Sequence, residues 1–209
     1  RSTLFPYTTL FRSLFIAKLM QRLPGNGAMV SIRADEDDVK ATLRGDVSIA
    51  AVNGPRSTVI SGDADTVLAI AAEWKERGVK THRLRVSHAF HSPHMDAMLD
   101  EFRRVAESLE YRPPEIPIVS NLTGNIAGSE ITTPEYWVRH VRQAVRFHQG
   151  ARTLHREGVT AYLELGPDAV LSALVQDALP GTDAVSVLRR DRPDRKSTRL
   201  NSSHLFISR

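Results

Sequence analysis

The stretch STVISGDADTVLAIAAEWKERG, residues 57–78, decides the fold of the first half of this chain. Its first six residues, 57–62, are rich in β-branched side chains and predict a short strand. An acidic segment follows, as is typical of the first turn of a helix, and Gly78 ends the pattern. Between them, apolar residues recur at helical spacing: Val67, Ile70, Ala71 and Trp74. The stretch therefore predicts a strand that leads directly into an amphipathic helix over residues 63–78.

The residues on either side extend this unit to a β-α-β-β-α-β order. Apolar periodicity and turn residues predict the remaining elements: strand GAMVSIRAD (27–35), helix EDDVKATLRG (36–45), strand VSIAAVN (47–53), turn NGPR (53–56) and strand VKTHRLRVS (79–87). This order over residues 27–86 is the split β-α-β pattern of ferredoxin-like folds.

The second half alternates helices and strands, which is typical of a parallel α/β layer. Ser92 and Pro93 have the chemistry of an N-cap and a first helical residue, and we expect the helix that they begin to run to about Glu110. The later elements are predicted in this order: a strand IPIVSN (116–121), one broken helix or two over 133–158, a strand VTAYLELG (159–166), and a helix that begins at Asp168.

Both ends of the chain resemble translated sequencing adapters. The sequences TLFPYTTLFRS (3–13) and DRKSTRLNSSH (194–204) equal what common adapter DNA encodes. Such segments do not belong to a fold, so we expect the natural segment to span about residues 14–193 and to be cut from a longer reading frame. The alternative is a basic targeting arm followed, at the other end, by a serine-rich tail.

The charge of the chain depends on these ends. The whole sequence has 28 Lys and Arg against 24 Asp and Glu, a net charge of +4. Without residues 1–13 and 194–209 there are 22 basic and 23 acidic residues, a net charge of −1. This balance gives no support to binding of nucleic acid or of a membrane surface. The absence of cysteine excludes disulfides and thiolate chemistry, and no apolar run reaches the roughly eighteen residues that span a membrane.

Three histidines lie three residues apart in VSHAFHSPHM, residues 86–95. A metal site is disfavoured because a serine–proline pair breaks any helix through His88, His91 and His94, and no acidic or cysteine ligand stands at a known motif spacing. Loop or capping histidines are one alternative. The other is catalysis. His91 directly precedes the N-cap, where the helix dipole opposes a positive charge, and a neutral imidazole is what a general base needs.

Seven motifs along the chain resemble one enzyme family, and they follow that family's order. They are GAMVSI, VNGPRSTVISG, VSHAFHSPHM, VSNLTG, YWVRHVRQAVRF, LELGP and VLRRDRP. From first to last they span nearly all of residues 14–193. In this combination they resemble the acyltransferase domain of modular type I polyketide synthases, which is related to malonyl-CoA:acyl-carrier-protein transacylases.

This resemblance implies a ping-pong acyl transfer. A serine in a G-H-S-x-G turn attacks malonyl-CoA, and the malonyl group then passes to the phosphopantetheine thiol of an acyl carrier protein. The last histidine of the family's HAFH block is the general base, which is His91 here, and the main-chain carbonyl at the position of His140 holds its imidazole. Asn53 corresponds to a residue that lines the substrate cleft. The blocks HAFH and YASH accompany malonyl and methylmalonyl units respectively, so His88 and Phe90 are expected to contact the acyl group. Asn53, His88 and Phe90 each have a purely structural alternative, as a turn, loop or core residue.

The resemblance also implies an architecture and a setting. The fold is expected to be α/β, with a ferredoxin-like small subdomain beside the C-terminal part of an α/β-hydrolase-like large subdomain. The expected segments are these: a helix end of the large subdomain (14–26), the small subdomain (27–86), more of the large subdomain (87–180), and a linker after the domain (181–193). The protein would be cytoplasmic, would need no bound cofactor or metal, and would act beside neighbouring synthase domains and a carrier protein, without nucleic acid or membrane partners.

One element of the family pattern does not occur in these 209 residues, which contain no G-x-S-x-G sequence. In the family, the serine turn, the oxyanion donors and an arginine that pairs with the malonyl carboxylate lie upstream of the position of residue 14. We therefore expect a chain that holds a general base and part of a pocket but is inactive alone. Two alternatives remain open: a stand-alone malonyl-CoA:acyl-carrier-protein transacylase of fatty-acid synthesis, and a ferredoxin-like binding module without chemistry.

Overall fold

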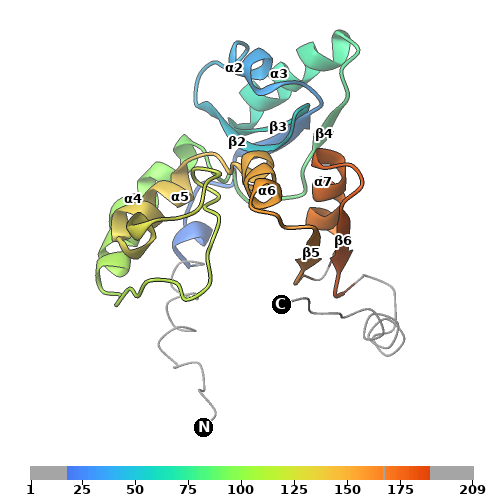
Figure 1. Cartoon of the computed structure of the whole chain (residues 1–209). Helices are drawn as coiled ribbons and strands as arrows, with labels where there is room; N and C mark the ends of the chain where they lie inside the picture. The colour runs from blue at the N-terminus through green and yellow to red at the C-terminus, as the bar shows by residue number, and fades with distance from the viewer. Residues whose placement is uncertain (1–17, 167, 189–209) are drawn as a thin grey trace. The chain divides into compact units, whose positions relative to one another are not determined.

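The computed structural model describes residues 18–166 and 168–188 (Figure 1). The chain divides into two compact units between Gly150 and Ala151. This division does not coincide with the subdomain boundary expected after residue 86.

The predicted features at the two ends of the chain fall largely outside the described residues. Both adapter-like segments, 1–13 and 194–209, lie there. Of the helix end expected over residues 14–26, residues 18–21 are helical, and the chain leaves the helix before Pro24.

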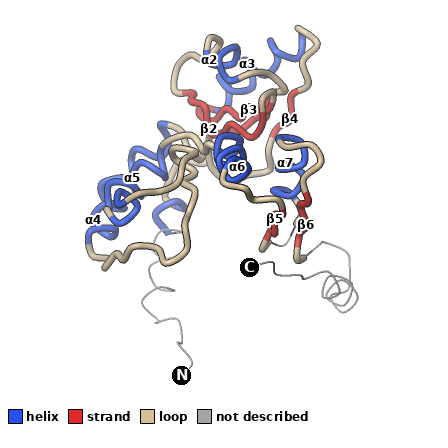
Figure 2. Tube along the Cα trace, in the orientation of Figure 1, coloured by secondary structure: helices blue, strands red, loops and turns tan. Residues whose placement is uncertain are grey.

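The first unit contains a four-stranded antiparallel sheet with the order β2-β3-β1-β4. Its elements follow one another as β1 (Gly27–Ile32), α2 (Glu36–Lys40), β2 (Val47–Gly54), β3 (Ser57–Asp63), α3 (Ala64–Glu76) and β4 (Thr81–Arg83). The predicted β-α-β-β-α-β order is therefore confirmed. Figure 2 shows the strands of this sheet with α2 and α3 beside them.

Helix α3 forms because its apolar residues fall on one face, which the sheet covers. Val67, Ile70, Ala71 and Trp74 are all buried, as their spacing predicts. They pack in one core with alternate residues of β1, among them Val30. The intervening residue Met29 points to the other face, where it packs with Ala50 and Val59. Both faces of the sheet are therefore covered, and the second face carries the candidate site.

The rest of the first unit is mainly helical. Its elements are η1 (Pro93–Met95), α4 (Asp96–Glu107), η2 (Ser129–Thr132), α5 (Pro134–Arg142) and the start of α6 (Phe147–Arg156). The helix predicted after Ser92 and Pro93 is present, with a 3-10 first turn and an end three residues before Glu110. The stretch 133–158 forms two helices. Apolar side chains of η1, α4 and α5 share one core, to which Met95, Phe102 and Val138 belong.

The prediction of a strand for IPIVSN, residues 116–121, is wrong. Within the part of the chain that the structure describes, the segment is a loop with one isolated bridge, between Val119 and Ile126. Ile116 is 78% exposed and Ile118 is 42% exposed. A strand requires a neighbouring ladder to satisfy its main-chain groups, and a single bridge does not supply one.

The second unit contains the end of α6 followed by a β-α-β arrangement. Strands β5 (Ala161–Glu164) and β6 (Asp183–Ser186) pair in parallel, and α7 (Val170–Ala178) connects them. The strand predicted over 159–166 is confirmed, whereas the helix begins two residues later than Asp168. Strand β6 was not predicted and falls within the interval expected to be a linker.

Helix α7 has no side-chain cap of its own, and β5 supplies one. The Glu164 carboxylate accepts hydrogen bonds from the amides of Leu171 (3.0 Å) and Ser172 (2.8 Å) and from the Ser172 hydroxyl (2.8 Å). These amides belong to the first turn of the helix and would otherwise have no partner within it. Glu164 of the LELGP motif therefore fixes the strand to the helix that follows. No helix in the two described ranges is long and apolar enough to cross a membrane.

Candidate active site

The segment that contains the three histidines is held in a tight turn by Ser92. Its hydroxyl donates to the carbonyl of Ala89 at 2.7 Å and accepts from the amide of His94 at 3.2 Å. Ser92 is fully buried and is the N-cap of η1, and Pro93 occupies the first helical position. Both roles are as the residue types predict. The turn places His91 between Ala89 and the cap.

His91 has an unusual backbone for a residue with a side chain. Its φ angle is 56°, and it is the one non-glycine residue with positive φ in the described part of the chain. An L-residue in this left-handed region costs roughly 1–2 kcal/mol, and such strain persists where the surroundings enforce it. Here the Ser92 bonds and the burial of Ala89 hold the turn. The strained position coincides with the histidine that the sequence analysis singled out.

The imidazole of His91 lies against the C-terminal end of α5. Burial lowers the pKa of His91 below its ordinary value, and the nearby His140 ring lowers it further. The main chain of Gln143, and more weakly that of His140, opposes this by raising the pKa. Nδ1 of His91 is buried and makes no hydrogen bond of ordinary geometry, so these carbonyls lie near the ring without a fully formed bond. The net effect favours a neutral imidazole at physiological pH, which is the state that can accept a proton.

The end of a helix is a natural place for such carbonyl groups. The last four carbonyls of α5 have no partner within the helix, and the His140 carbonyl is one of them. Burial also lowers the pKa of the His140 side chain. The structure thus brings His91 and His140 together. It also places Gln143 at the ring, a residue that the sequence analysis missed and for which the sequence contains no signal.

The segment after α5 is joined to the edge of β2. The amide of Val145 donates to the Ala50 carbonyl at 2.9 Å, and the amide of Val52 donates to the Val145 carbonyl at 2.9 Å. Asn53 is the next residue of β2, and Gln143 is two residues before Val145, within about 7 Å of it along the chain. The strand edge that carries Asn53 therefore adjoins the segment that faces His91. The Asn53 side chain makes no hydrogen bond to any described residue.

Phe90 lies between two cores. It is half-buried and packs both against the cluster that contains Met95 and Val138 and against the cluster that contains Met29 and Val59. The ring of His88 lies 6.1 Å from the Phe90 ring, and its Nδ1 lies 3.0 Å from the Ser87 hydroxyl. Phe90 and His88 are thus neighbours, and Phe90 is immediately before the strained His91.

Gly27 is a further residue that shapes this turn. A Cβ atom at Gly27 would lie 2.5 Å from Cβ of Ala89 and 3.2 Å from Nδ1 of His94. Only glycine lets β1 approach the turn so closely. His94 accordingly faces β1, and Asp63 at the end of β3 also interacts with it electrostatically. Among residues 18–166 and 168–188, no three His, Asp or Glu side chains gather as a metal ion would require.

The family model described as "Acyl transferase domain" matches residues 3–208. This chain belongs to the acyl transferase domain family. A curated relative, the spectinabilin polyketide synthase system protein NorB of Streptomyces orinoci, is 50% identical over 200 residues, which is 91% of this chain and 9% of that protein. The acyl transferase domain therefore resembles a small part of a modular polyketide synthase, and it spans less than a tenth of that relative.

Solved structures agree with this assignment. The acyltransferase domain from the second module of the salinomycin polyketide synthase has a TM-score of 0.82 and 54% identity, with 86% of this chain and 43% of that one covered. The acyl transferase domain of SpnD, in complex with 2-(pent-4-yn-1-yl)malonyl, has a TM-score of 0.84 and 33% identity, with 90% and 47% covered. The α/β fold is that of polyketide synthase acyltransferase domains, and this chain spans about half of each solved domain.

Proposed function

We propose that this chain carries the general base and part of the acyl pocket of an acyltransferase that moves a malonyl unit from malonyl-CoA to the phosphopantetheine thiol of an acyl carrier protein. The observation that carries the proposal is the conformation and environment of His91. Its side chain is half-buried, its φ angle is 56°, partial burial lowers the pKa of its imidazole, and the ring faces main-chain carbonyls at the end of α5. His140 contributes one of these carbonyls. No cofactor or metal takes part in this chemistry.

Two acyl exchanges make up the reaction. In the first, the oxygen of a serine outside this chain attacks the thioester carbonyl of malonyl-CoA while His91 takes the hydroxyl proton. The C–S bond then breaks, and the CoA thiolate leaves with that proton. In the second, His91 takes the proton of the phosphopantetheine thiol and the sulfur attacks the acyl-enzyme ester. The C–O bond to serine then breaks, and the serine oxygen takes the proton from His91. Main-chain acceptors beside the imidazole favour one tautomer and stabilise its protonated form during each exchange.

The architecture follows from this assignment. Residues 27–86 correspond to the ferredoxin-like small subdomain, supported by the strand order β2-β3-β1-β4. The remaining elements correspond to the C-terminal part of an α/β-hydrolase-like large subdomain. The small share of NorB that the chain covers favours a domain inside a multidomain cytoplasmic synthase, with neighbouring domains and a carrier protein as partners, over a stand-alone transacylase.

The chain as it stands is proposed to be inactive, because its 209 residues hold no G-x-S-x-G serine and an imidazole alone cannot form the acyl-enzyme ester. Incubation of the chain with malonyl-CoA, followed by intact-mass measurement, is expected to show no stoichiometric adduct. A malonyl ester on any serine of the chain would contradict this.

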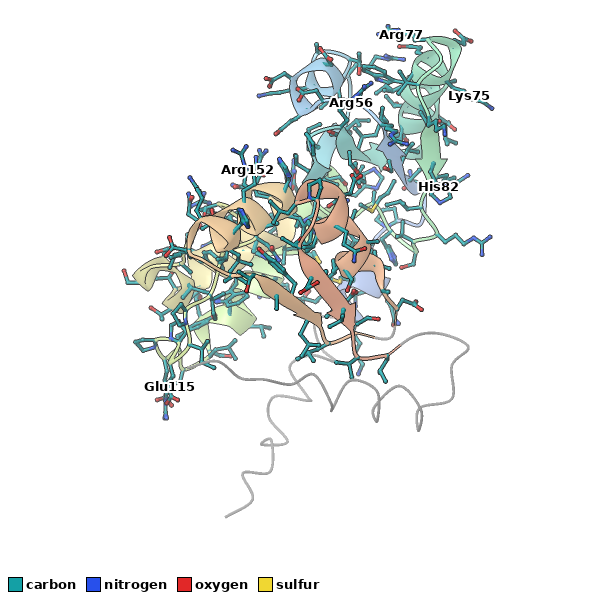
Figure 3. All side chains as sticks on the ribbon, turned by 45° about the vertical axis from the view of Figure 1, so that its right-hand side comes forward. Arg56, Lys75, Arg77, His82, Glu115 and Arg152 are labelled. Carbon is teal, nitrogen blue, oxygen red and sulfur yellow. The ribbon has the colours of Figure 1, made fainter. Side chains whose placement is uncertain are left out.

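The role of His91 is tested in a domain completed with the upstream half of a close relative. His91→Ala is expected to lower the acylation rate roughly 10³-fold or more, because the base and the nucleophile act as a unit. The matched control is His82→Ala, since His82 is an exposed histidine on β4 (Figure 3). It should retain full activity. A loss below tenfold for His91→Ala would place the base elsewhere.

A further inference from the structure

An ion pair connects the segment after α5 to the first residue of helix α2. Nη1 of Arg146 lies 2.6 Å from each carboxylate oxygen of Glu36, although the two residues are 110 positions apart. Both side chains are half-buried, with 31% and 23% of their surfaces exposed. In each of the other ion pairs of the described residues, such as Arg44–Glu73, at least one side chain is 40% or more exposed. A partly desolvated charge pair constrains its residues more than an exposed one does.

The main chain around Arg146 is fixed as well. The amide of Arg146 donates to the Asn121 carbonyl at 2.7 Å, and its carbonyl accepts from the Gly150 amide at 2.9 Å. The preceding residue, Val145, forms the bridge to Ala50 and Val52 of β2. The segment from Gln143 to Arg146 is therefore held at one end by α5 and at the other by the ion pair and the β2 edge.

We propose that Glu36 and Arg146 are positioning residues for His91: their ion pair fixes residues 143–146 so that the Gln143 main chain faces the imidazole. This inference rests on the proposed function of His91 as general base. Neither residue contacts the reacting atoms. They act through the two residues that separate Arg146 from Gln143, so a shift of about 1 Å at Arg146 would displace the Gln143 carbonyl from its place beside the imidazole.

The first test uses the 209-residue chain and the nitrogen chemical shifts of its histidine rings, with the His91 signals assigned from their loss in His91→Ala. In the unchanged chain, His91 is expected to hold predominantly one neutral tautomer, because the main-chain acceptors select it. Glu36→Gln and Arg146→Gln are each expected to move the ring shifts toward the average of the two tautomers. Unchanged His91 shifts in both variants would overturn the inference.

The matched control is Glu73→Gln, which removes the exposed Arg44–Glu73 pair on α3, the helix that packs against the face of the sheet opposite to the site. It should leave the His91 ring shifts unchanged. If Glu73→Gln moved these shifts as much as Glu36→Gln does, the effect would reflect general destabilisation of the chain and not positioning of His91. The charge-swapped variant Glu36→Arg with Arg146→Glu should recover most of the single-tautomer signal. Failure of this swap to recover any of it, in a chain that remains folded by circular dichroism, also counts against the inference.

A second measurement separates this inference from the proposed function. In the completed domain, Arg146→Gln is expected to lower the acylation kcat roughly tenfold, with little change in KM, because it affects the base and not malonyl-CoA binding. If His91→Ala has no effect on acylation, the proposed function fails whatever the ring shifts show. If His91→Ala is inactive but Arg146→Gln leaves both kcat and the ring shifts unchanged, only the positioning role fails.

Discussion

The hydroxyl of Ser92 donates to the carbonyl of Ala89 at 2.7 Å and so closes the backbone across His91. The same oxygen accepts a hydrogen bond from the His94 amide. Ser92 is therefore the N-cap of η1 and also the residue whose hydroxyl closes the turn. Because Ser92 and Ala89 are both fully buried, water cannot replace either bond. These two bonds hold the turn that contains the left-handed residue His91.

Ser92→Ala is therefore expected to destabilise the chain by about 1–3 kcal/mol, because it leaves the Ala89 carbonyl buried without a donor and removes a helix cap. Urea unfolding followed by tryptophan fluorescence measures the change. Ser108→Ala is the matched control, since the Ser108 hydroxyl makes the same kind of bond, to the Val105 carbonyl at 2.7 Å, on an exposed surface. Equal decreases in the free energy of unfolding for the two variants would show that the Ser92 bonds do not stabilise the turn.

Gly27→Ala should be destabilising by roughly 1–3 kcal/mol, as expected when an atom is forced into a packed contact. The added Cβ would lie 2.5 Å from Cβ of Ala89, so either β1 or the histidine turn must shift. Gly25→Ala provides the control, because nothing lies within 4 Å of a Cβ atom at that position. Thermal unfolding of the two variants compares them directly, and a Gly27→Ala protein as stable as Gly25→Ala would show that β1 does not press on the turn.

The positive φ angle of His91 predicts the relative stability of two variants at this position. Both His91→Ala and His91→Gly remove the imidazole, but only glycine adopts φ 56° without steric cost. His91→Gly is expected to be more stable than His91→Ala by about 1 kcal/mol, although glycine is normally the less favourable of the two. Chemical denaturation of both variants tests this. The reverse order of stability would mean that the turn is not left-handed in solution.

Local periodicity explains why the first half of the fold was predictable. The burial of Val67, Ile70, Ala71 and Trp74 follows from their spacing. The helix start at Ser92, the N-cap, and Pro93, the first helical residue, follows from their chemistry. Each of these features is decided within a few residues of sequence. The segment IPIVSN shows where prediction from local sequence fails. An apolar run becomes a strand only when another strand pairs with it, and among the described residues only one bridge forms here.

The site was predictable only in part, for a related reason. His91 stood out through its place before an N-cap and through the family resemblance, whereas its neighbours come from distant parts of the chain. No pattern within the sequence indicates that Gln143 faces the ring or that Glu36 meets Arg146 across 110 positions. The left-handed backbone at His91 likewise depends on the bonds of Ser92 and on the close approach of β1 to Ala89, and not on the residue type of His91 itself.

The cap on α7 predicts a pH dependence. Desolvation raises the pKa of Glu164, but the bonds from the Ser172 amide, the Leu171 amide and the Ser172 hydroxyl together lower it below the ordinary value. A lowered pKa means that the carboxylate stabilises the fold above its unfolded pKa, and that this contribution is lost as the pH falls through the folded pKa.

Hydrogen exchange at the Leu171 and Ser172 amides measures this effect directly. Glu164→Gln is expected to lower their protection factors at pH 7, where the wild-type carboxylate is charged. The difference between variant and wild type should shrink as the pH approaches about 3, below the ordinary pKa of glutamate of about 4.3. A difference that stays constant between pH 7 and pH 3 would rule out an ionised cap.

Phe90 is expected to set the choice of acyl unit. It immediately precedes the proposed base, and a phenyl ring beside the α-carbon of a bound malonyl group leaves little room for an α-methyl. The half-buried ring packs against two cores, so its position is fixed. One methyl contact is worth about 1–3 kcal/mol, or roughly 10–200-fold in discrimination, so the preference for malonyl-CoA should be strong but not absolute.

The double variant Phe90→Ser with His88→Tyr, made in the completed domain, is the test, with His88→Tyr alone as its control. In competition between equal concentrations of malonyl-CoA and methylmalonyl-CoA, the double variant should admit methylmalonyl units, because the serine removes the ring volume. Its total activity should fall, since the space left beside His91 loosens the turn, whereas the control should keep the malonyl preference. If the unchanged domain already prefers methylmalonyl-CoA, or if the double variant leaves the product ratio where it was, the Phe90 ring does not select the acyl group, and its packing against the two cores is its whole role.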